Sequence, residues 1–428
     1  MTDPFVVPDS FWTEVTSLWK QAPRVWRRPF DTPFGAEEDV FRALCALSAR
    51  LDTGDTSIQP RVFVEDKQTG FSIDRHAARP DDGDLGGFER RLLAGLAGRE
   101  LGMVVGDAAI LDDVLWRRAV RFLGGLHAAL ARSGGGTPAG GSHAEIFFGN
   151  YQRSFFGVHK DRLETFTFVV RGRKRFLTWP YEALLALPGV PADAPLHAFA
   201  FDDLDLAALR DQAVVLEGGP GDVLFWPASW WHVAESVEEG FVTTLTLACA
   251  PSTMLAAGSP LRLAQEGFDE AGKDGYYTED PALPEVSGPE GARAAIAAVE
   301  SALDRVLADE TLRRARRDAT LAWLSASGFK RGPDRLPLPE LAPTDRLVVD
   351  ARIVYADVEE DGFTCAVNGI LLQSMPNFLP LVEHLNAGGT FTVAELVERF
   401  GGGDGQPAPD ELVEALAHLT AARAVRLV

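Results

Sequence analysis

Two histidines and an aspartate stand at spacings that could hold a metal ion. His159 and Asp161 are two positions apart in the stretch FFGVHKDRLETFTFVVRGRKRFLTWP, residues 155–180. On an extended strand, residues i and i+2 project to the same face, so both side chains would point into one space beside an apolar wall. Further along, GGPGDVLFWPASWWHVAES (218–236) predicts a turn, a strand, and His232 at the start of the next strand.

Two imidazoles and one carboxylate can occupy one face of an octahedral metal. Non-haem Fe(II) oxygenases use this arrangement because it leaves three positions open for a cosubstrate and O2. A structural zinc site prefers four closed ligands, often including cysteine. The three cysteines are scattered along the chain and none is near the two motifs. The alternative interpretation of an isolated His-x-Asp pair is a hydrogen-bonded strand pair without metal.

Lys174 belongs to the same pattern. It lies fifteen residues after His159, on a predicted strand entered through the turn Arg171-Gly172-Arg173. A lone ammonium group facing a barrel interior is costly to bury, but a carboxylate ligand that pairs with it would remove that cost. We expect Lys174 to bind the distal carboxylate of 2-oxoglutarate, whose 2-oxo acid end would chelate iron.

The elements that must position these residues have a simple order. Residues 1–130 mix helical patterns with one short extended piece, and the Gly-rich loop 133–141 separates them from the next part of the chain. Six short strand candidates then occur between residues 143 and 250, which favours an antiparallel sandwich or barrel.

The remainder of the chain is largely helical. Residues 287–329 have apolar residues every three or four positions, and 330–345 are rich in proline. Residues 346–428 have the pattern of two strands, three helices and a final strand, the order of a small winged-helix unit. We expect three parts: a catalytic domain with an N-terminal helical elaboration (1–255), a helical region with a linker (256–340) and a winged-helix-like domain (341–428).

The net charge of the chain limits which macromolecules it can bind. The 428-residue chain has a net charge of −21, and residues 341–428 carry thirteen Asp or Glu against five Lys or Arg. Nucleic-acid phosphates would be repelled, whereas a cationic protein or peptide would be attracted. The alternative is that acidity serves solubility alone. Neither a secretory signal nor an apolar run of about 18 residues is visible, so we expect a cytoplasmic protein without a membrane segment.

These motifs together carry a family resemblance. His159, Asp161, Lys174 and the segment GDVLFWPASWWH ending in His232 resemble the JmjC class of Fe(II)/2-oxoglutarate oxygenases. The segment DGYYTEDPALPE, the helices after it and the terminal unit are similar to bacterial ribosomal-oxygenase-type JmjC proteins. The resemblance implies an α+β fold: a double-stranded β-helix (cupin/JmjC jelly roll) with N-terminal helices, a helical dimerisation region and a C-terminal winged helix.

The resemblance also implies an activity. Fe(II) would be held by His159, Asp161 and His232, with 2-oxoglutarate as cosubstrate and O2 as oxidant, in a homodimeric hydroxylase of a protein or peptide side chain. Demethylation would use the same iron chemistry. An oxygenase of a free amino acid or small metabolite and a non-oxygenase metal-binding cupin are the alternatives. The sequence departs from the family on either side of the first histidine, at QRSFFGVH and at residues 162–164, which leaves the substrate open.

Overall fold

The computed structural model describes residues 4–65, 67–136, 138, 140–185, 206–250, 310–356 and 358–428, with isolated residues between 290 and 301. The chain divides into two compact units, one of residues 1–138 and 142–252 and one of residues 139–141 and 253–428. The predicted motif DGYYTEDPALPE and most of residues 256–309, which belong to the predicted helical region and linker 256–340, lie outside the described residues.

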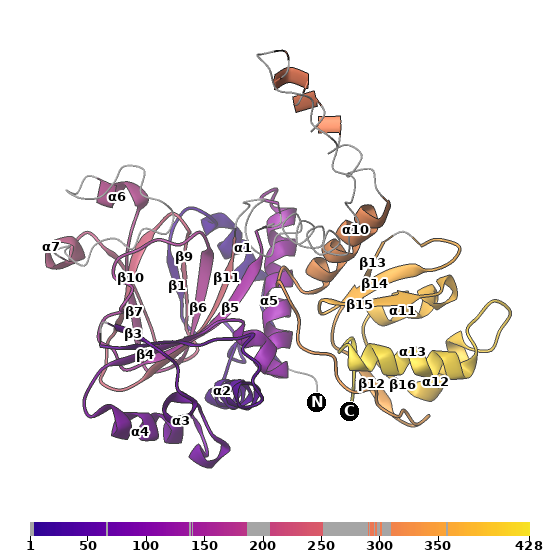
Figure 1. Cartoon of the computed structure of the whole chain (residues 1–428), viewed down its shortest axis with the longest axis horizontal. Helices are drawn as coiled ribbons and strands as arrows, with labels where there is room; N and C mark the ends of the chain where they lie inside the picture. The colour runs from indigo at the N-terminus through magenta and orange to yellow at the C-terminus, as the bar shows by residue number, and fades with distance from the viewer. Residues whose placement is uncertain are drawn as a thin grey trace. The chain divides into compact units, whose positions relative to one another are not determined.

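Two antiparallel sheets build the first unit (Figure 1). The larger has the order β1 (Arg24–Trp26), β9 (Val223–Trp226), β6 (Glu164–Arg171), β11 (Val242–Cys249), β5 (Ser142–Gly149), β4 (Leu101–Val105), β2 (Arg61–Val64) and β3 (Lys67–Thr69). The smaller has the order β10 (Trp231–Ser236), β7 (Lys174–Trp179) and β8 (Val214–Gly218). Both sheets line one interior cavity, as in the antiparallel sandwich or barrel that the sequence predicted.

Strand β6 shows why this sequence builds a walled cavity. Its residues alternate between threonine and phenylalanine, and alternate side chains project to opposite faces of a sheet. Thr165 and Thr167 line the interior cavity. Phe166 and Phe168 point to the other face, where each ring centroid lies 5.2 Å from that of Phe122. One face of the strand therefore builds the core and the other builds the site.

Helices cover the outer face of the large sheet. Phe122 belongs to α5 (Asp113–Arg132), which begins at the N-cap Asp112, whose carboxylate accepts two backbone N–H bonds. Phe11 of α1 (Asp9–Leu18) also packs against Phe122. The other helices among the described residues of this unit are α2 (Glu37–Asp52), α3 (Ile73–His76), α4 (Leu85–Leu96), α6 (Tyr181–Leu185) and α7 (Leu206–Arg210), with short 3-10 turns at Pro80–Asp82 and Ala108–Leu111.

The described residues of the second unit form α10 (Glu310–Ser325), two three-stranded sheets and three further helices (Figure 1). One sheet has the order β16 (Thr390–Thr392), β12 (Arg346–Val349), β17 (Val425–Leu427); the other has the order β13 (Val354–Tyr355), β14 (Phe363–Val367), β15 (Ile370–Ser374). The helices are α11 (Leu379–Asn386), α12 (Val393–Phe400) and α13 (Pro409–Ala421). Leu412 and Leu416 of α13 are fully buried in the core of this unit.

The three helices and the final strand of residues 346–428 occur as predicted, but the strands are more numerous: four precede α11, and β16 lies between α11 and α12. The predicted strand CAVNGILLQ is a hairpin of β14 and β15. The winged-helix assignment and the dimerising role of the helical region stay predictions. Across the residues that the structure describes, no helix has both the length and the apolarity needed to cross a membrane.

Candidate metal centre

Backbone hydrogen bonds hold the two predicted histidine ligands side by side. The N–H of His159 donates to the carbonyl of His232 at 3.0 Å, and the N–H of His232 donates to the carbonyl of His159 at 2.7 Å. This isolated bridge is the only strand-like pairing of His159 among the described residues. The sequence had predicted a longer extended segment. Instead, Phe155 and Phe156 form a turn and Gly157, at φ +63°, redirects the chain just before the bridge.

Asp161 completes the cluster. Its carboxylate oxygens lie 4.0 Å from Nε2 of His159 and 3.5 Å from Nε2 of His232. All three ligand atoms lie within 4.8 Å of one another. Two atoms bound to one ion at about 2.1 Å lie at most about 4.2 Å apart, so small side-chain movements would bring all three onto one metal. The structure thus brings together the three residues that the sequence predicted as ligands.

The backbone also presents the correct nitrogen of each ring. Nδ1 of His159 lies 3.1 Å from the carbonyl of Gly157, and Nδ1 of His232 lies 3.4 Å from the carbonyl of Trp230. A proton on each Nδ1 leaves the Nε2 lone pair for a metal. Burial and the neighbouring His159 lower the pKa of His232 to about 3, so this imidazole is neutral at physiological pH. Two imidazole nitrogens and one carboxylate oxygen suit a divalent transition metal.

Lys174 lines the same cavity as the triad. Its side chain is 2% exposed, and Nζ donates a hydrogen bond to the Tyr151 hydroxyl at 2.8 Å. Nζ also lies 4.3 Å from the centroid of the Tyr151 ring. No carboxylate forms an ion pair with Lys174 in the part of the chain that the structure describes. A buried ammonium group with only neutral partners could pair with an anionic ligand that enters the cavity.

The cavity has a volume of about 80 Å³, which is room for several water-sized groups. Its walls are partly aromatic, from Phe156, Phe176 and Trp226, and partly hydroxylic, from threonines of β6 and β11. Trp226 is 3% exposed, and its indole N–H is buried without a hydrogen-bond partner among the described residues. Neither this unused donor nor the contact between Tyr151 and Lys174 was predicted from the sequence.

Trp231 has a packing role beside the site. Its side chain is fully buried, its indole N–H donates to the carbonyl of Tyr181 at 3.0 Å, and its ring stacks on that of Tyr181. Lys160 is buried next to this pair, with Nζ 4.3 Å from the centroid of the Tyr181 ring. Because neighbouring residues of β10 face opposite ways, Trp231 anchors the outer face of the strand while His232 faces the cavity.

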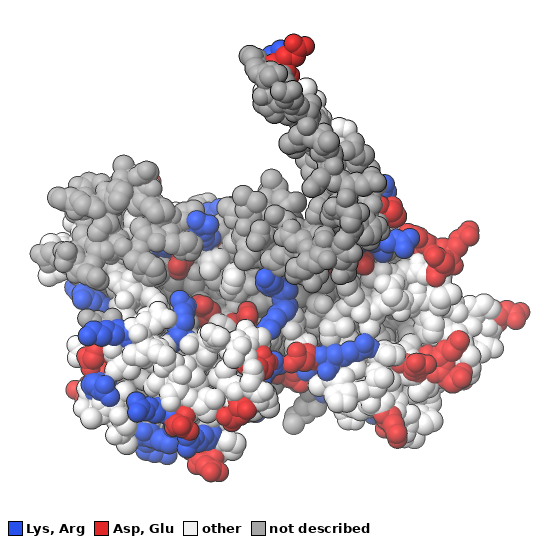
Figure 2. All heavy atoms as spheres, in the orientation of Figure 1, with Lys and Arg blue, Asp and Glu red and all other residues white. Residues whose placement is uncertain are grey.

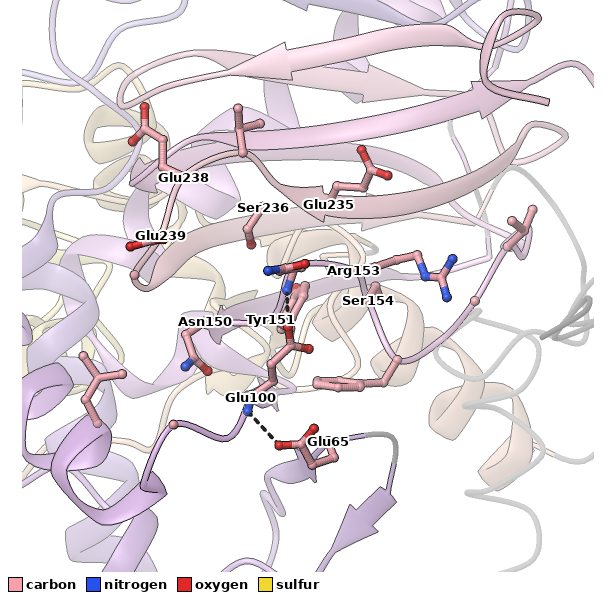
Figure 3. A pocket seen from close by; sticks show the side chains of 18 residues that line it. Glu65, Glu100, Asn150, Tyr151, Arg153, Ser154, Glu235, Ser236, Glu238 and Glu239 are labelled. Atoms are coloured by element: carbon pink, nitrogen blue, oxygen red, sulfur yellow. Dashed lines mark hydrogen bonds between the residues drawn. The ribbon is translucent and has the colours of Figure 1, made fainter. Parts of the chain in front are cut away.

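An open groove of about 1270 Å³ adjoins the cavity, and Tyr151 and Ser154 line both (Figure 3). The groove is strongly acidic. Among the described residues of its lining, Arg153 is the one cation, against five carboxylates: Glu65, Glu100, Glu235, Glu238 and Glu239.

Two of these carboxylates have arginine partners. Glu235 pairs with Arg175 and Arg210, and Glu238 lies 3.6 Å from Arg173. Glu65 and Glu100 accept only backbone N–H bonds. Together with Glu239, they form no ion pair within the described ranges of the chain. The groove therefore keeps an excess of negative charge beside the cavity.

Comparisons with known proteins agree with this architecture. Residues 129–249 match the family model described as a cupin-like domain. The X-ray structure of ycfD from E. coli is 14% identical, with all of both chains covered and a TM-score of 0.54. A structure of the E. coli ribosomal oxygenase YcfD is 15% identical, again over the whole of both chains, with a TM-score of 0.51.

A further YcfD structure, in complex with cobalt and 2-oxoglutarate, is 15% identical with a TM-score of 0.50, and the match covers 97% of this chain and 98% of that one. A comparison with curated protein sequences gives no match. The resemblance to a JmjC-type ribosomal oxygenase is thus confirmed at the level of the fold. Residues 129–249 form a cupin-like domain, and the chain as a whole has the fold of YcfD.

Proposed function

We propose that this protein is an Fe(II)- and 2-oxoglutarate-dependent oxygenase that hydroxylates a side chain in a cationic protein or peptide. One observation carries the proposal: a His-Asp-His cluster and a buried lysine without a carboxylate partner among the described residues line the same cavity. The cobalt and 2-oxoglutarate in a YcfD structure support the same pair of ligands for this fold.

The donor set fits Fe(II). His159, Asp161 and His232 offer two nitrogens and one oxygen, with no thiolate among the described residues of the cluster. When bound, iron and 2-oxoglutarate would use O2 to convert a C–H bond to C–OH, with succinate and CO2 as coproducts. Lys174 would hold the distal carboxylate, and the Tyr151 hydroxyl would keep the ammonium group in place through its 2.8 Å hydrogen bond.

The cavity walls would protect this chemistry. Phe156, Phe176 and Trp226 supply aromatic surface next to the cluster, which limits the entry of water. The ring of Trp226 lies 4.9 Å from that of His232, centroid to centroid, and restricts the movement of this ligand. The chain would therefore orient the metal ligands, balance the charge of the distal carboxylate of 2-oxoglutarate through Lys174, and exclude solvent.

The acidic groove supports a polypeptide substrate. A volume of about 1270 Å³ exceeds what a small metabolite needs, and Glu65, Glu100 and Glu239 offer carboxylates that no described cation neutralises. Cationic chains would be attracted to such a surface, and salt would weaken the attraction. Ribosomal proteins are the first candidates, since they are cationic and YcfD is described as a ribosomal oxygenase.

Mass spectrometry and succinate release test the proposal together. Purified protein with Fe(II), 2-oxoglutarate and O2 should add one oxygen atom to a lysine- and arginine-rich peptide and release succinate in step. A free amino acid should give no product. The value of kcat/KM should fall with ionic strength while kcat changes little, because salt screens the encounter and not the chemistry.

Two controls make the result specific. His232→Ala should release no succinate, and Glu65→Gln with Glu100→Gln should raise KM for the peptide and leave the KM for 2-oxoglutarate unchanged. A kcat/KM that is flat across the salt range would remove the electrostatic argument and leave the oxygenase. Absence of succinate with every substrate would remove the oxygenase.

A further inference from the structure

The second unit has a groove of its own, lined by residues of β15, by Met375 and by residues of α13. It has a volume of about 420 Å³, within the range of ligand-binding clefts. Its lining is mainly apolar and includes Cys365, Leu372, Phe378, Leu381, Val382 and Leu419. Two apolar residues of this lining are exposed on the surface: Leu371 is 40% exposed and Met375 is 53% exposed.

A strand edge opens onto this groove. β15 pairs with β14 on one side and ends the order β13-β14-β15, so its other edge pairs with no strand within the described part of the chain. Such an edge presents backbone N–H and C=O groups that can pair with an added strand. An apolar groove beside a free strand edge is the arrangement by which strand addition recognises extended peptides.

Charge selects among the possible occupants. Glu411 and Glu414 of α13 line the groove and are exposed. Arg335, which is hydrogen-bonded to His418, is the only cationic residue among the described residues of the lining, so the two carboxylates leave an excess of negative charge there. The surrounding residues 341–428 have a net charge of −8 from thirteen acidic and five basic residues, and red carboxylates outnumber blue side chains on the visible face of this unit (Figure 2).

A second copy of this chain would therefore meet like charge, as would nucleic acid. A cationic polypeptide would meet complementary charge. We propose that the groove between β15 and α13 binds an extended, cationic segment of a polypeptide by strand addition. Apolar side chains of that segment enter the groove, and its lysines or arginines approach Glu411 and Glu414.

This proposal rests on the proposed function in one respect: the polypeptide that binds the groove is the substrate of the oxygenase. The segment that binds here is separate from the segment that carries the modified side chain. Holding the substrate at a second place raises the effective concentration of its reactive segment. Specificity would then depend on two segments of the substrate, and only one of them enters the catalytic cavity.

Binding can be measured without iron, 2-oxoglutarate or turnover. The probe is a fluorescent peptide that alternates lysine with leucine and valine, titrated with the full-length, metal-free protein in an anisotropy assay. We expect saturable binding, and none for the same peptide with glutamate in place of lysine. In an added strand, every second backbone N–H points towards β15 and the others point away from it. N-methylation of the peptide residues whose N–H groups point towards β15 should therefore abolish binding. N-methylation of the residues between them should be tolerated.

Variants locate the site. Glu411→Lys with Glu414→Lys should weaken binding about tenfold, and Leu371→Asp should weaken it comparably. Glu398→Lys, an exposed change of the same sign on α12, is the matched control and should bind as the parent does. Equal binding of both N-methylated peptides, or equal binding by all variants, would overturn the proposal. A concentration-dependent dimer lost in Leu371→Asp would overturn it in favour of a second copy.

The outcome is independent of catalysis. A protein that binds the lysine peptide but forms no succinate keeps the docking site and loses the oxygenase. A protein that hydroxylates substrates but does not bind the probe keeps the oxygenase and loses the docking site.

Discussion

Replacement of Lys174 by methionine tests the cosubstrate site, because it removes the charge and keeps a side chain of similar length. Lys174 is 2% exposed, and its Nζ has a neutral hydrogen-bond partner, Tyr151. A charge-assisted hydrogen bond contributes about 1.5–3 kcal/mol. Its loss corresponds to a roughly 10- to 150-fold rise in the Kd of 2-oxoglutarate.

Calorimetric titration of 2-oxoglutarate, with a redox-inert divalent ion in the metal site, measures this Kd directly. Tyr151→Phe provides a graded comparison, since it removes the hydrogen bond to Nζ and keeps the charge. A neutral partner is worth about 0.5–1.5 kcal/mol, so the Kd should rise only roughly 2- to 10-fold. The Tm of metal-free Lys174→Met should not fall, because a buried unpaired charge is itself costly.

An unchanged Kd in a folded Lys174→Met protein would refute the reasoning, and another residue would have to bind the distal carboxylate. A large fall in Tm with the same loss of affinity would also refute it, since Lys174 would then act through the fold.

Three other properties can be tested directly. His159→Ala or His232→Ala should lose Fe(II) and succinate formation while circular dichroism stays that of the parent, because the bridge between the two residues is made by backbone atoms; full turnover by either variant would contradict the ligand assignment. Burial raises the pKa of Glu164 to about 7, so the parent binds an extra proton in the folded state and loses stability as the pH rises from about 4.5 to 7. Glu164→Gln should therefore gain on the order of 3 kcal/mol over the parent between about pH 5 and pH 8, seen as a Tm difference that grows with pH; a constant difference would contradict it. Light scattering at micromolar concentration should give the mass of a homodimer, and a monomer mass would count against a dimerising role for the helical region.

The clustering of the three proposed metal ligands was predictable because their signals are local. His159 and Asp161 are neighbours in the sequence, and His232 comes after a strand whose turn, Gly221-Asp222, is marked by its residues. Lys174 was predictable for the same reason, since Gly172, at φ +72°, forms the hairpin turn that leads into its strand. At these positions, residue type and short-range geometry determine where the side chain lies.

The rest of the site depends on long-range pairing that no short pattern reveals. Trp226 reaches the cavity through the pairing of β9 with β6, in which it lies opposite Thr165, and a shift of one residue would turn it outward. Strand β4 was not predicted, because the buried run LGMVV is short and lies among helices. Its pairing of Gly102 with Gly149 sets the end of β5, just before Tyr151.

The pairing of β1 with β9 has a consequence for synthesis of the chain. Residues 24–26 complete the edge of the large sheet by pairing with residues 223–225, and Arg27 pairs with Asp222 across 195 positions. Translation at about 5–20 residues per second leaves roughly 10–40 s between the appearance of the two strands. During that interval the N-terminal helix and Trp19, which finally stacks on Phe225, have no completed sheet edge to pack against. The first unit can therefore close only late in translation, and the aromatic side chains of its N-terminal segment lack their final partners until then.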